Sequence, residues 1–140
     1  MNTVLLVDDD SMVTSIYRNK FQGEGFEVEV ASRGNDALNL MKSLHVDAVV
    51  LDLQLPGMNG VEVLQAIRST DEISAIPVVV FSNAFLGNLV EQAWQAGASL
   101  VLSKMSCSPN QLVDAVRKAI NMKRPRPPRK PPSSSTSKKE

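Results

Sequence analysis

The sequence has 140 residues and a mass of 15.2 kDa, the size of one ordinary domain with a short remainder. Fifteen basic residues balance fifteen acidic ones, and one Cys and one His exclude an internal disulfide framework and a histidine-based metal cluster. No stretch approaches the roughly 20 apolar residues of a membrane span, and no signal-peptide pattern opens the chain. We therefore expect a protein without a membrane span and with a cytoplasmic location.

The charges divide the chain into two parts. Residues 1–122 carry eight basic and fourteen acidic side chains, whereas residues 123–140 carry seven basic and one acidic. The second part is rich in Pro and Ser and cannot bury enough apolar surface to offset the cost of ordering. We expect a folded domain over 1–122 and a disordered basic tail over 123–140.

The tail allows several interpretations. It can be a solvated extension, or its charge can attract an acidic partner, including the acidic domain itself. Residues 125–130 also match the PxxPx[KR] pattern of segments that bind polyproline-recognising grooves.

Short apolar runs alternate with segments of helical periodicity along the domain. In chain order, the predicted elements are strand Val4–Val7, helix Met12–Phe21, strand Phe26–Ala31, helix Ala37–Leu44, strand Val46–Leu51, helix Val61–Ile67, strand Val78–Phe81, helix Leu86–Trp94, strand Leu100–Leu102 and helix Leu112–Ile120. Five strand–helix repeats predict an α/β fold, a (βα)5 doubly wound parallel sheet with helices on both faces. The alternation of Glu and apolar residues in Phe26–Ala31 predicts an edge strand.

Local signals agree with these boundaries. Ser108 and Gln111 form a capping-box pattern around Pro109, which predicts that the last helix starts there. Gly97 is placed to end the fourth helix, and Pro56-Gly57 marks a loop after the third strand.

Polar residues follow four of the predicted strands, where parallel sheets bind ligands. They are Asp8-Asp9-Asp10, Asp52, Ser82 and Lys104. Each one alone is explained by a turn, a solvated charge or a helix cap, the role open to Asp10. Together they would crowd carboxylates into one place, where a pair about 4 Å apart repels by roughly 4 kcal/mol at an effective dielectric of 20.

Such a cluster needs a cation, an ammonium or a proton to persist. Oxygen ligands without His or Cys favour Mg²⁺. A carboxylate beside Mg²⁺, with a lysine and a hydroxyl aimed at the same place, predicts phosphoryl transfer onto Asp.

Four motifs in this order resemble the receiver domain of two-component response regulators, the CheY-like family. The motifs are Val4-Leu5-Leu6-Val7-Asp8-Asp9-Asp10, Asp52-Leu53-Gln54-Leu55-Pro56-Gly57-Met58-Asn59-Gly60, Ser82, and Gly97-Ala98 followed by Lys104. The resemblance covers about residues 2–121 and implies a flavodoxin-like sheet of strand order 2-1-3-4-5.

The resemblance also implies the roles of the site residues. Asp52 would be the phosphoacceptor, Ser82 would hydrogen-bond a phosphate oxygen, and Lys104 would pair with the phosphoryl group. Asp8 and Asp9 would hold Mg²⁺ together with Asp52 and the backbone carbonyl of Gln54. Gly60 would let the third helix begin beneath Asp52.

The expected function is that of a single-domain response regulator. It would accept a phosphoryl group from a sensor histidine kinase or a histidine phosphotransfer protein. It would then signal to an unknown target protein by protein–protein contact, because no DNA-binding domain fits in the tail. Beyond its own phosphoryl transfer and autodephosphorylation it would not be an enzyme.

Two departures from the usual receiver pattern leave an alternative open. Met105 stands where receivers usually have Pro after the lysine, and Val101 stands where they commonly carry Tyr or Phe. A phosphorylation-independent adaptor on a receiver scaffold is therefore the alternative. A haloacid dehalogenase phosphatase would need Asp at Gln54, and a flavodoxin would need a phosphate-binding loop where the carboxylates of Asp8 and Asp9 stand.

Overall fold

The computed structural model describes residues 1–83 and 88–122. Its elements are β1 Thr3–Val7, α1 Ser11–Gly23, β2 Glu27–Ala31, α2 Gly34–Ser43, β3 Ala48–Leu51, α3 Gly60–Arg68, the 3₁₀ helix η1 Asp71–Ile73, β4 Val78–Ser82, α4 Leu89–Gln95, β5 Leu100–Ser103 and α5 Pro109–Met122. The predicted strand–helix alternation is confirmed, with boundaries that differ by a few residues. The predicted helix start at Leu86 and the tail over 123–140 lie outside the described residues.

The five strands form one parallel sheet in the order β2-β1-β3-β4-β5. This is the predicted doubly wound order 2-1-3-4-5. The buried strands β1, β3 and β4 occupy the central positions, and the alternating run β2 is an edge strand, as its pattern predicts.

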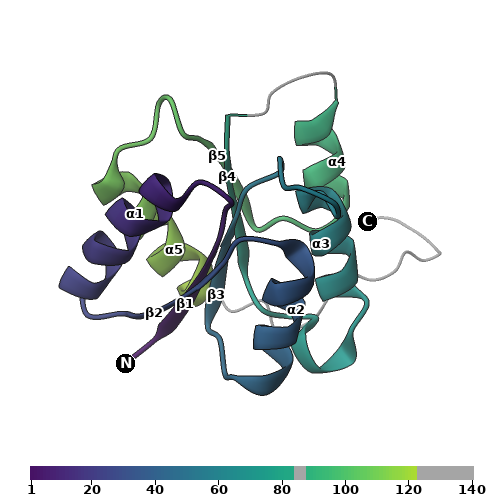
Figure 1. Ribbon diagram of the computed structural model, residues 1–140, viewed down its shortest axis with the longest axis horizontal. Coiled ribbons are helices and arrows are strands. Elements are labelled where there is room, and N and C mark those ends of the chain that lie inside the picture. The colour runs from purple at the N-terminus through teal and green to yellow at the C-terminus, as the bar shows by residue number, and fades with distance from the viewer. Residues whose placement is uncertain (84–87, 123–140) are drawn as a thin grey trace.

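Helices cover both faces of the sheet, with α1 and α5 on one side and α2, α3 and α4 on the other (Figure 1). Successive residues of a strand pack into different hydrophobic clusters, one on each face of the sheet. Leu5 and Val7 belong to the cluster that contains Ala37 of α2, whereas Val4 and Leu6 belong to the cluster that contains residues of α5. Since both faces are buried, the central strands β1, β3 and β4 are almost entirely apolar.

Capping interactions set the ends of several helices. Ser108 and Gln111 exchange the two hydrogen bonds of a capping box, at 2.7 and 3.2 Å, so α5 begins at Pro109 as predicted. Gly97 has φ 106°, a left-handed conformation that suits glycine after α4. The carboxylate of Asp10 accepts hydrogen bonds from Met12 N–H and Val13 N–H and thereby caps α1.

Arg68 connects three segments at the end of α3. Its guanidinium donates to the carbonyl of Gly97 at 2.8 and 3.0 Å, and to the carbonyls of Ser74 and Ile76 at 3.1 and 2.6 Å. These charge-assisted hydrogen bonds join the segment that precedes β4 in the sequence to the turn that precedes β5. No local sequence pattern predicts this role of Arg68.

Candidate functional site

The ladder of the sheet continues one residue beyond the strands and places the polar residues side by side. Asp8 N–H donates to Ala31 O at 3.1 Å, Asp52 N–H donates to Val7 O at 3.0 Å, and Lys104 N–H donates to Ser82 O at 3.2 Å. Since Val7 pairs with Leu51, Asp8 and Asp52 follow in register on adjacent strands. The carboxyl edge of the sheet therefore collects residues that are far apart in the sequence.

The side chains of these residues meet in a connected network. Lys104 Nζ donates to Asp8 Oδ2 at 2.6 Å and to Asp52 Oδ2 at 3.1 Å. Ser82 Oγ donates to Asp52 Oδ1 at 2.6 Å, and Gln54 N–H donates to the same oxygen at 3.1 Å. Asp8, Asp52 and Ser82 are buried, so these charge-assisted bonds lie in an environment of low dielectric.

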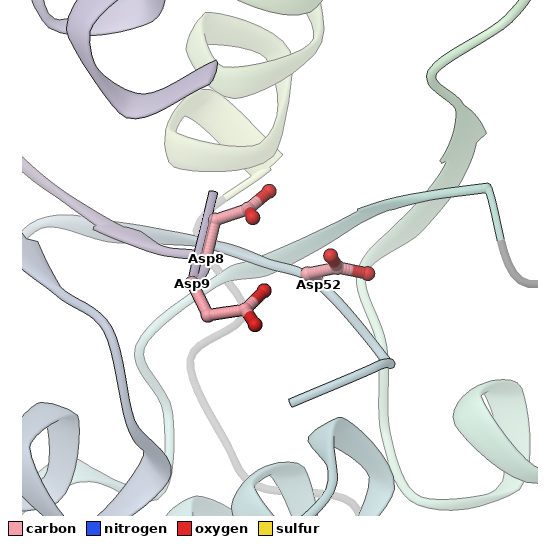
Figure 2. Close-up of side chains that lie close together, drawn as sticks. All are labelled: Asp8, Asp9 and Asp52. Atoms are coloured by element: carbon pink, nitrogen blue, oxygen red, sulfur yellow. The ribbon is translucent and has the colours of Figure 1, made fainter. Parts of the chain in front are cut away.

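Three carboxylates form an acidic cluster at this edge. Figure 2 shows Asp8 and Asp9 next to each other at the end of β1, with Asp52 beside them at the end of β3. One oxygen from each lies within 4.8 Å of the others, and Asp9 is exposed while Asp8 and Asp52 are buried. An all-oxygen donor set that is open to solvent on one side fits a hard divalent cation that retains several waters.

The environment of the cluster raises the pKa values of both Asp8 and Lys104. Burial raises the pKa of Asp8 above 3.8, although hydrogen bonds from Lys104 and from Asp10 N–H oppose this effect. Burial also acts to lower the pKa of Lys104, but its bonds and charge interactions with Asp8 and Asp52 outweigh burial and raise that pKa above 10.5. Lys104 is thus an ammonium that offsets part of the negative charge of the cluster.

Asp10 has a different role from its two neighbours. Its side chain caps α1, and its N–H donates to Asp8 Oδ1 at 2.9 Å. Asp10 therefore orients Asp8 while the ligand atoms of the cluster come from Asp8, Asp9 and Asp52.

The loop after β3 is shaped by glycines. Gly57 has φ 73°, as the turn at Pro56-Gly57 requires. A Cβ on Gly60 would collide with the backbone of Asp52 and Leu53. The start of α3 is therefore packed directly under Asp52, and the expectation for Gly60 is confirmed in its geometry.

An aromatic pair on the α1 side of the sheet was not identified from the sequence. Phe81 of β4 and Tyr17 of α1 meet edge to face, with ring centroids 5.2 Å apart. Lys104 Nζ lies over the Phe81 ring, 6.0 Å from its centroid. The only sequence signal was that Phe81 directly precedes Ser82, and nothing in the spacing pointed to Tyr17.

The two positions that depart from the usual receiver pattern are close to Lys104 in the sequence. Val101 is partly buried and packs against the core on the α2–α4 side, whereas Met105 is 85% exposed. Met105 N–H donates to Ser103 Oγ at 3.1 Å, which orders the backbone directly after Lys104.

The doubly wound fold and its acidic carboxyl edge match one known class of signalling domain. Residues 4–117 match the family described as the response regulator receiver domain, and the chain belongs to this family. The chain is 34% identical to the DNA-binding response regulator MtrA of Mycobacterium tuberculosis (strain H37Rv) over 114 residues, 81% of this chain and 48% of MtrA. It is 41% identical to the transcriptional regulatory protein CpxR of Escherichia coli (strain K12) over 76 residues, 54% of this chain and 32% of CpxR. The chain thus spans about half the length of the MtrA proteins.

Solved structures agree with this assignment. A putative response regulator from Chloroflexus aurantiacus superposes with a TM-score of 0.80 at 28% identity, over 86% of this chain and 98% of that one. A CheY-like receiver domain from Methanospirillum hungatei superposes with a TM-score of 0.82, over 88% of this chain and 96% of that one. The second has 20% identity and supports the fold alone. Receiver domains are signalling modules rather than classical enzymes.

Among the helices within residues 1–83 and 88–122, none has the length and apolar character needed to cross a membrane.

Proposed function

We propose that this receiver domain is a phosphoacceptor that takes a phosphoryl group onto Asp52 with the help of Mg²⁺. The observation that carries the proposal is the convergence of Lys104, Ser82 and the acidic cluster on the carboxylate of Asp52. A buried carboxylate whose neighbours are an ammonium, a hydroxyl and a cluster of oxygen ligands fits phosphoryl transfer.

In this proposal Asp8, Asp9, Asp52 and the carbonyl of Gln54 are the ligands of the cation. Mg²⁺, when bound, supplies positive charge that offsets the charge on the transferring phosphoryl group. Asp8 is held for this role by Asp10 N–H, and Asp9 faces solvent, where the cation keeps its waters.

The proposed donor is a phosphohistidine of a sensor histidine kinase or of a histidine phosphotransfer protein. A carboxylate oxygen of Asp52 attacks phosphorus, a P–O bond forms and the P–N bond breaks. The imidazole nitrogen keeps the electron pair and takes a proton from solvent. Ser82 Oγ–H and the Lys104 ammonium are placed to donate to phosphoryl oxygens, and hydrolysis of the acyl phosphate by water resets the domain.

Phosphorylation with a small donor tests the proposal. The protein is incubated with Mg²⁺ and acetyl phosphate, and intact-protein mass spectrometry is expected to detect one added phosphate that hydroxylamine removes. Asp52→Asn is expected to abolish it, whereas Asp114→Asn, an exposed carboxylate on α5, is expected to leave it unchanged. Phosphate uptake by Asp52→Asn at the rate of the wild-type protein would contradict the proposed acceptor.

We further propose that output occurs by protein–protein contact of the receiver surface and that the protein acts in the cytoplasm. MtrA and CpxR are named as a DNA-binding regulator and a transcriptional regulator, and this chain spans only part of their length. Capture of one target by the phosphorylated protein but not by the unphosphorylated protein would support contact through the receiver. Sequence-specific DNA binding by the same protein would contradict it.

We propose that the basic segment 123–140 is a contact segment distinct from the phosphorylation site. Its net charge is opposite to that of residues 1–122, which supports contact with an acidic partner or with the domain itself. Contact with a polyproline-binding partner stays an alternative. Charge-driven contact is expected to weaken as salt rises, whereas recognition of the Pro125–Lys130 pattern is expected to be lost when its prolines are replaced by alanine.

The second candidate function is a phosphorylation-independent adaptor. It is favoured by Val101, whose aliphatic side chain packs into the core where receivers commonly carry an aromatic residue. Equal target affinity with and without phosphate on Asp52 would favour the adaptor over the phosphorylation-dependent function.

A further inference from the structure

The ring of Phe81 lies beneath the ammonium of Lys104. A cation within about 6 Å of an aromatic face is attracted by the ring quadrupole, and the attraction is stronger where water is excluded. Lys104 Nζ is 6.0 Å from the ring centroid, and Phe81 is buried in the core cluster on the α1–α5 side. The ring therefore adds an attraction that favours positions of the ammonium above it.

Tyr17 extends this contact to α1. Its ring meets Phe81 at an interplanar angle of 77°, the edge-to-face arrangement that aromatic quadrupoles prefer. Tyr17 and Phe81 also line a small cavity together with Asp8 and Asp52. The aromatic pair and the two carboxylates thus line the same cavity. A displacement of Phe81 therefore changes the packing around Tyr17 and around the carboxylates.

Lys104 has to serve two sets of partners. It bonds to Asp8 and Asp52 in this structure, and in the proposed function it also pairs with a phosphoryl oxygen on Asp52. A lysine side chain is flexible and its ammonium imposes little geometry of its own. The backbone N–H of Lys104 donates a hydrogen bond to the carbonyl of Ser82, the residue after Phe81. The lysine directly after β5 is therefore held next to the end of β4, the strand that carries the ring.

We propose that Phe81 is a positioning residue that holds the Lys104 ammonium at the phosphorylation site, and that Tyr17 transmits a change in Lys104 to α1. This inference rests on the proposed phosphoacceptor function. Phe81 acts through its contact with the Lys104 ammonium. The pair supplies an aromatic connection on the α1 side of the sheet, whereas the usual aromatic position is occupied here by Val101.

The chain contains a matched control for this pair. Phe26 and Phe21 also meet edge to face with centroids 5.2 Å apart, and Arg117 lies over Phe26 at 5.6 Å. Both pairs belong to the same core cluster, but Arg117 forms an ion pair with Glu24, whereas Lys104 forms its ion pairs with Asp8 and Asp52. Phe81→Leu and Phe26→Leu therefore remove equivalent rings, and only Phe81→Leu removes one beneath Lys104.

The first measurement is the rate of phosphate incorporation from acetyl phosphate with Mg²⁺. Phe81→Leu is expected to be about three- to thirty-fold slower than wild type, the range that a partly desolvated cation–π contact supports, and Phe26→Leu is expected to be unchanged. Fluorinated phenylalanines at position 81, which keep the ring shape and weaken the quadrupole, are expected to slow the rate progressively. This series keeps the inference testable if Phe81→Leu fails to fold. A rate that does not change with fluorination would overturn it.

The second measurement follows Tyr17 itself, the only tyrosine of the chain. Ring resonances of Tyr17 are expected to shift when Mg²⁺ and beryllofluoride, a phosphoryl mimic, are added to wild type and to Phe26→Leu. The shift is expected to be lost in Phe81→Leu. A Tyr17 shift of equal size in Phe81→Leu would overturn transmission through the ring.

Failure of the proposed function is distinguishable from failure of this inference. If the wild-type protein takes up no phosphate, the phosphoacceptor proposal fails, and titration with Mg²⁺ alone then tests the aromatic pair. A Tyr17 shift with Mg²⁺ that is present in wild type and absent in Phe81→Leu supports the coupling. The absence of any Tyr17 shift in wild type overturns it.

Discussion

The shorter of the two Lys104 ammonium–carboxylate contacts is with Asp8, at 2.6 Å, and not with Asp52, at 3.1 Å. Asp8 is therefore both a partner of Lys104 and a member of the acidic cluster. A cation that takes over Asp8 competes with Lys104 for this carboxylate and leaves the ammonium available to a phosphoryl group on Asp52. In the proposed function, metal binding and phosphoryl pairing would be coupled through this one side chain.

Asp8→Asn is expected to stabilise the fold and to weaken Mg²⁺ binding. Burial raises the pKa of Asp8, so the folded protein disfavours the ionised form, and a neutral amide of the same shape relieves this cost. We expect a gain of about 1 kcal/mol in the free energy of unfolding at neutral pH, measured with urea, and more than about tenfold weaker Mg²⁺ affinity.

The pH dependence of this gain follows from the direction of the shift. Wild-type Asp8 is protonated below 3.8 in both folded and unfolded states, so the difference from Asp8→Asn is expected to vanish there and to grow as pH rises through the raised pKa. A variant that is less stable than wild type at neutral pH would contradict the sign.

Lys104→Met is expected to show the opposite behaviour. The raised pKa of Lys104 means that the folded protein favours the ammonium, so its contribution is fully present below pH 10.5 and is lost as pH rises through the folded pKa. We expect a loss of about 2–3 kcal/mol at neutral pH, because Asp8 and Asp52 lose their shared partner. Urea unfolding of both proteins at neutral and alkaline pH measures this difference.

The gap between wild type and Lys104→Met is expected to close above pH 10.5. The two proteins share all their other side chains, and the comparison therefore isolates the effect of Lys104. A gap that stays constant across this range would show that the loss comes from packing rather than from charge.

Asp9→Asn and Asp10→Asn separate metal binding from helix capping in two adjacent carboxylates. Asp9 belongs to the acidic cluster, whereas Asp10 caps α1. We expect Asp9→Asn to weaken Mg²⁺ affinity about tenfold or more, by isothermal titration calorimetry, with stability unchanged. Asp10→Asn keeps a side-chain oxygen for the cap and is expected to change both quantities little. Equal loss of Mg²⁺ affinity in both variants would argue against Asp9 as a direct ligand.

Gly60→Ala is expected to damage the site through the backbone. The added Cβ would collide with the carbonyl of Asp52 and with Leu53, and backbone atoms cannot move aside as a flexible side chain does. We expect a loss of about 2 kcal/mol or more in unfolding free energy and slower phosphate uptake on Asp52.

Gly23→Ala is the matched control for Gly60→Ala. A Cβ on Gly23 meets nothing within 4 Å, and Gly23 lies at the end of α1. This substitution is expected to be neutral or to stabilise by about 0.4–1 kcal/mol. A Gly60→Ala protein as stable as Gly23→Ala would contradict the close packing beneath Asp52.

The sequence was sufficient to predict the fold and the main contacts of the site. Strand and helix differ in apolar periodicity, and parallel strands bring their carboxyl ends to one edge, so Asp8, Asp52, Ser82 and Lys104 could be predicted to meet. The strand order came from the resemblance, because periodicity does not determine which strands are neighbours. The roles of these residues in phosphoryl transfer stay predictions until they are tested.

The interactions that the sequence did not reveal are those that depend on tertiary packing. Arg68 reaches the carbonyl of Gly97 across 29 residues, and no local pattern distinguishes it from an arginine on a helix surface. Tyr17 and Phe81 look like ordinary apolar positions of a helix and a strand. Their relation to Lys104 depends on which face of the sheet each occupies, which only the assembled fold determines.

The large sequence separation between Lys104 and Asp8 affects when the site can form during synthesis of the protein. Its contact with Asp8 spans 96 residues, so every strand must be synthesised and paired before the ammonium can reach the carboxylates. A nascent chain that lacks β5 presents Asp8 and Asp52 without this partner. Phosphate uptake on Asp52 is therefore expected only once the chain has been synthesised beyond Lys104.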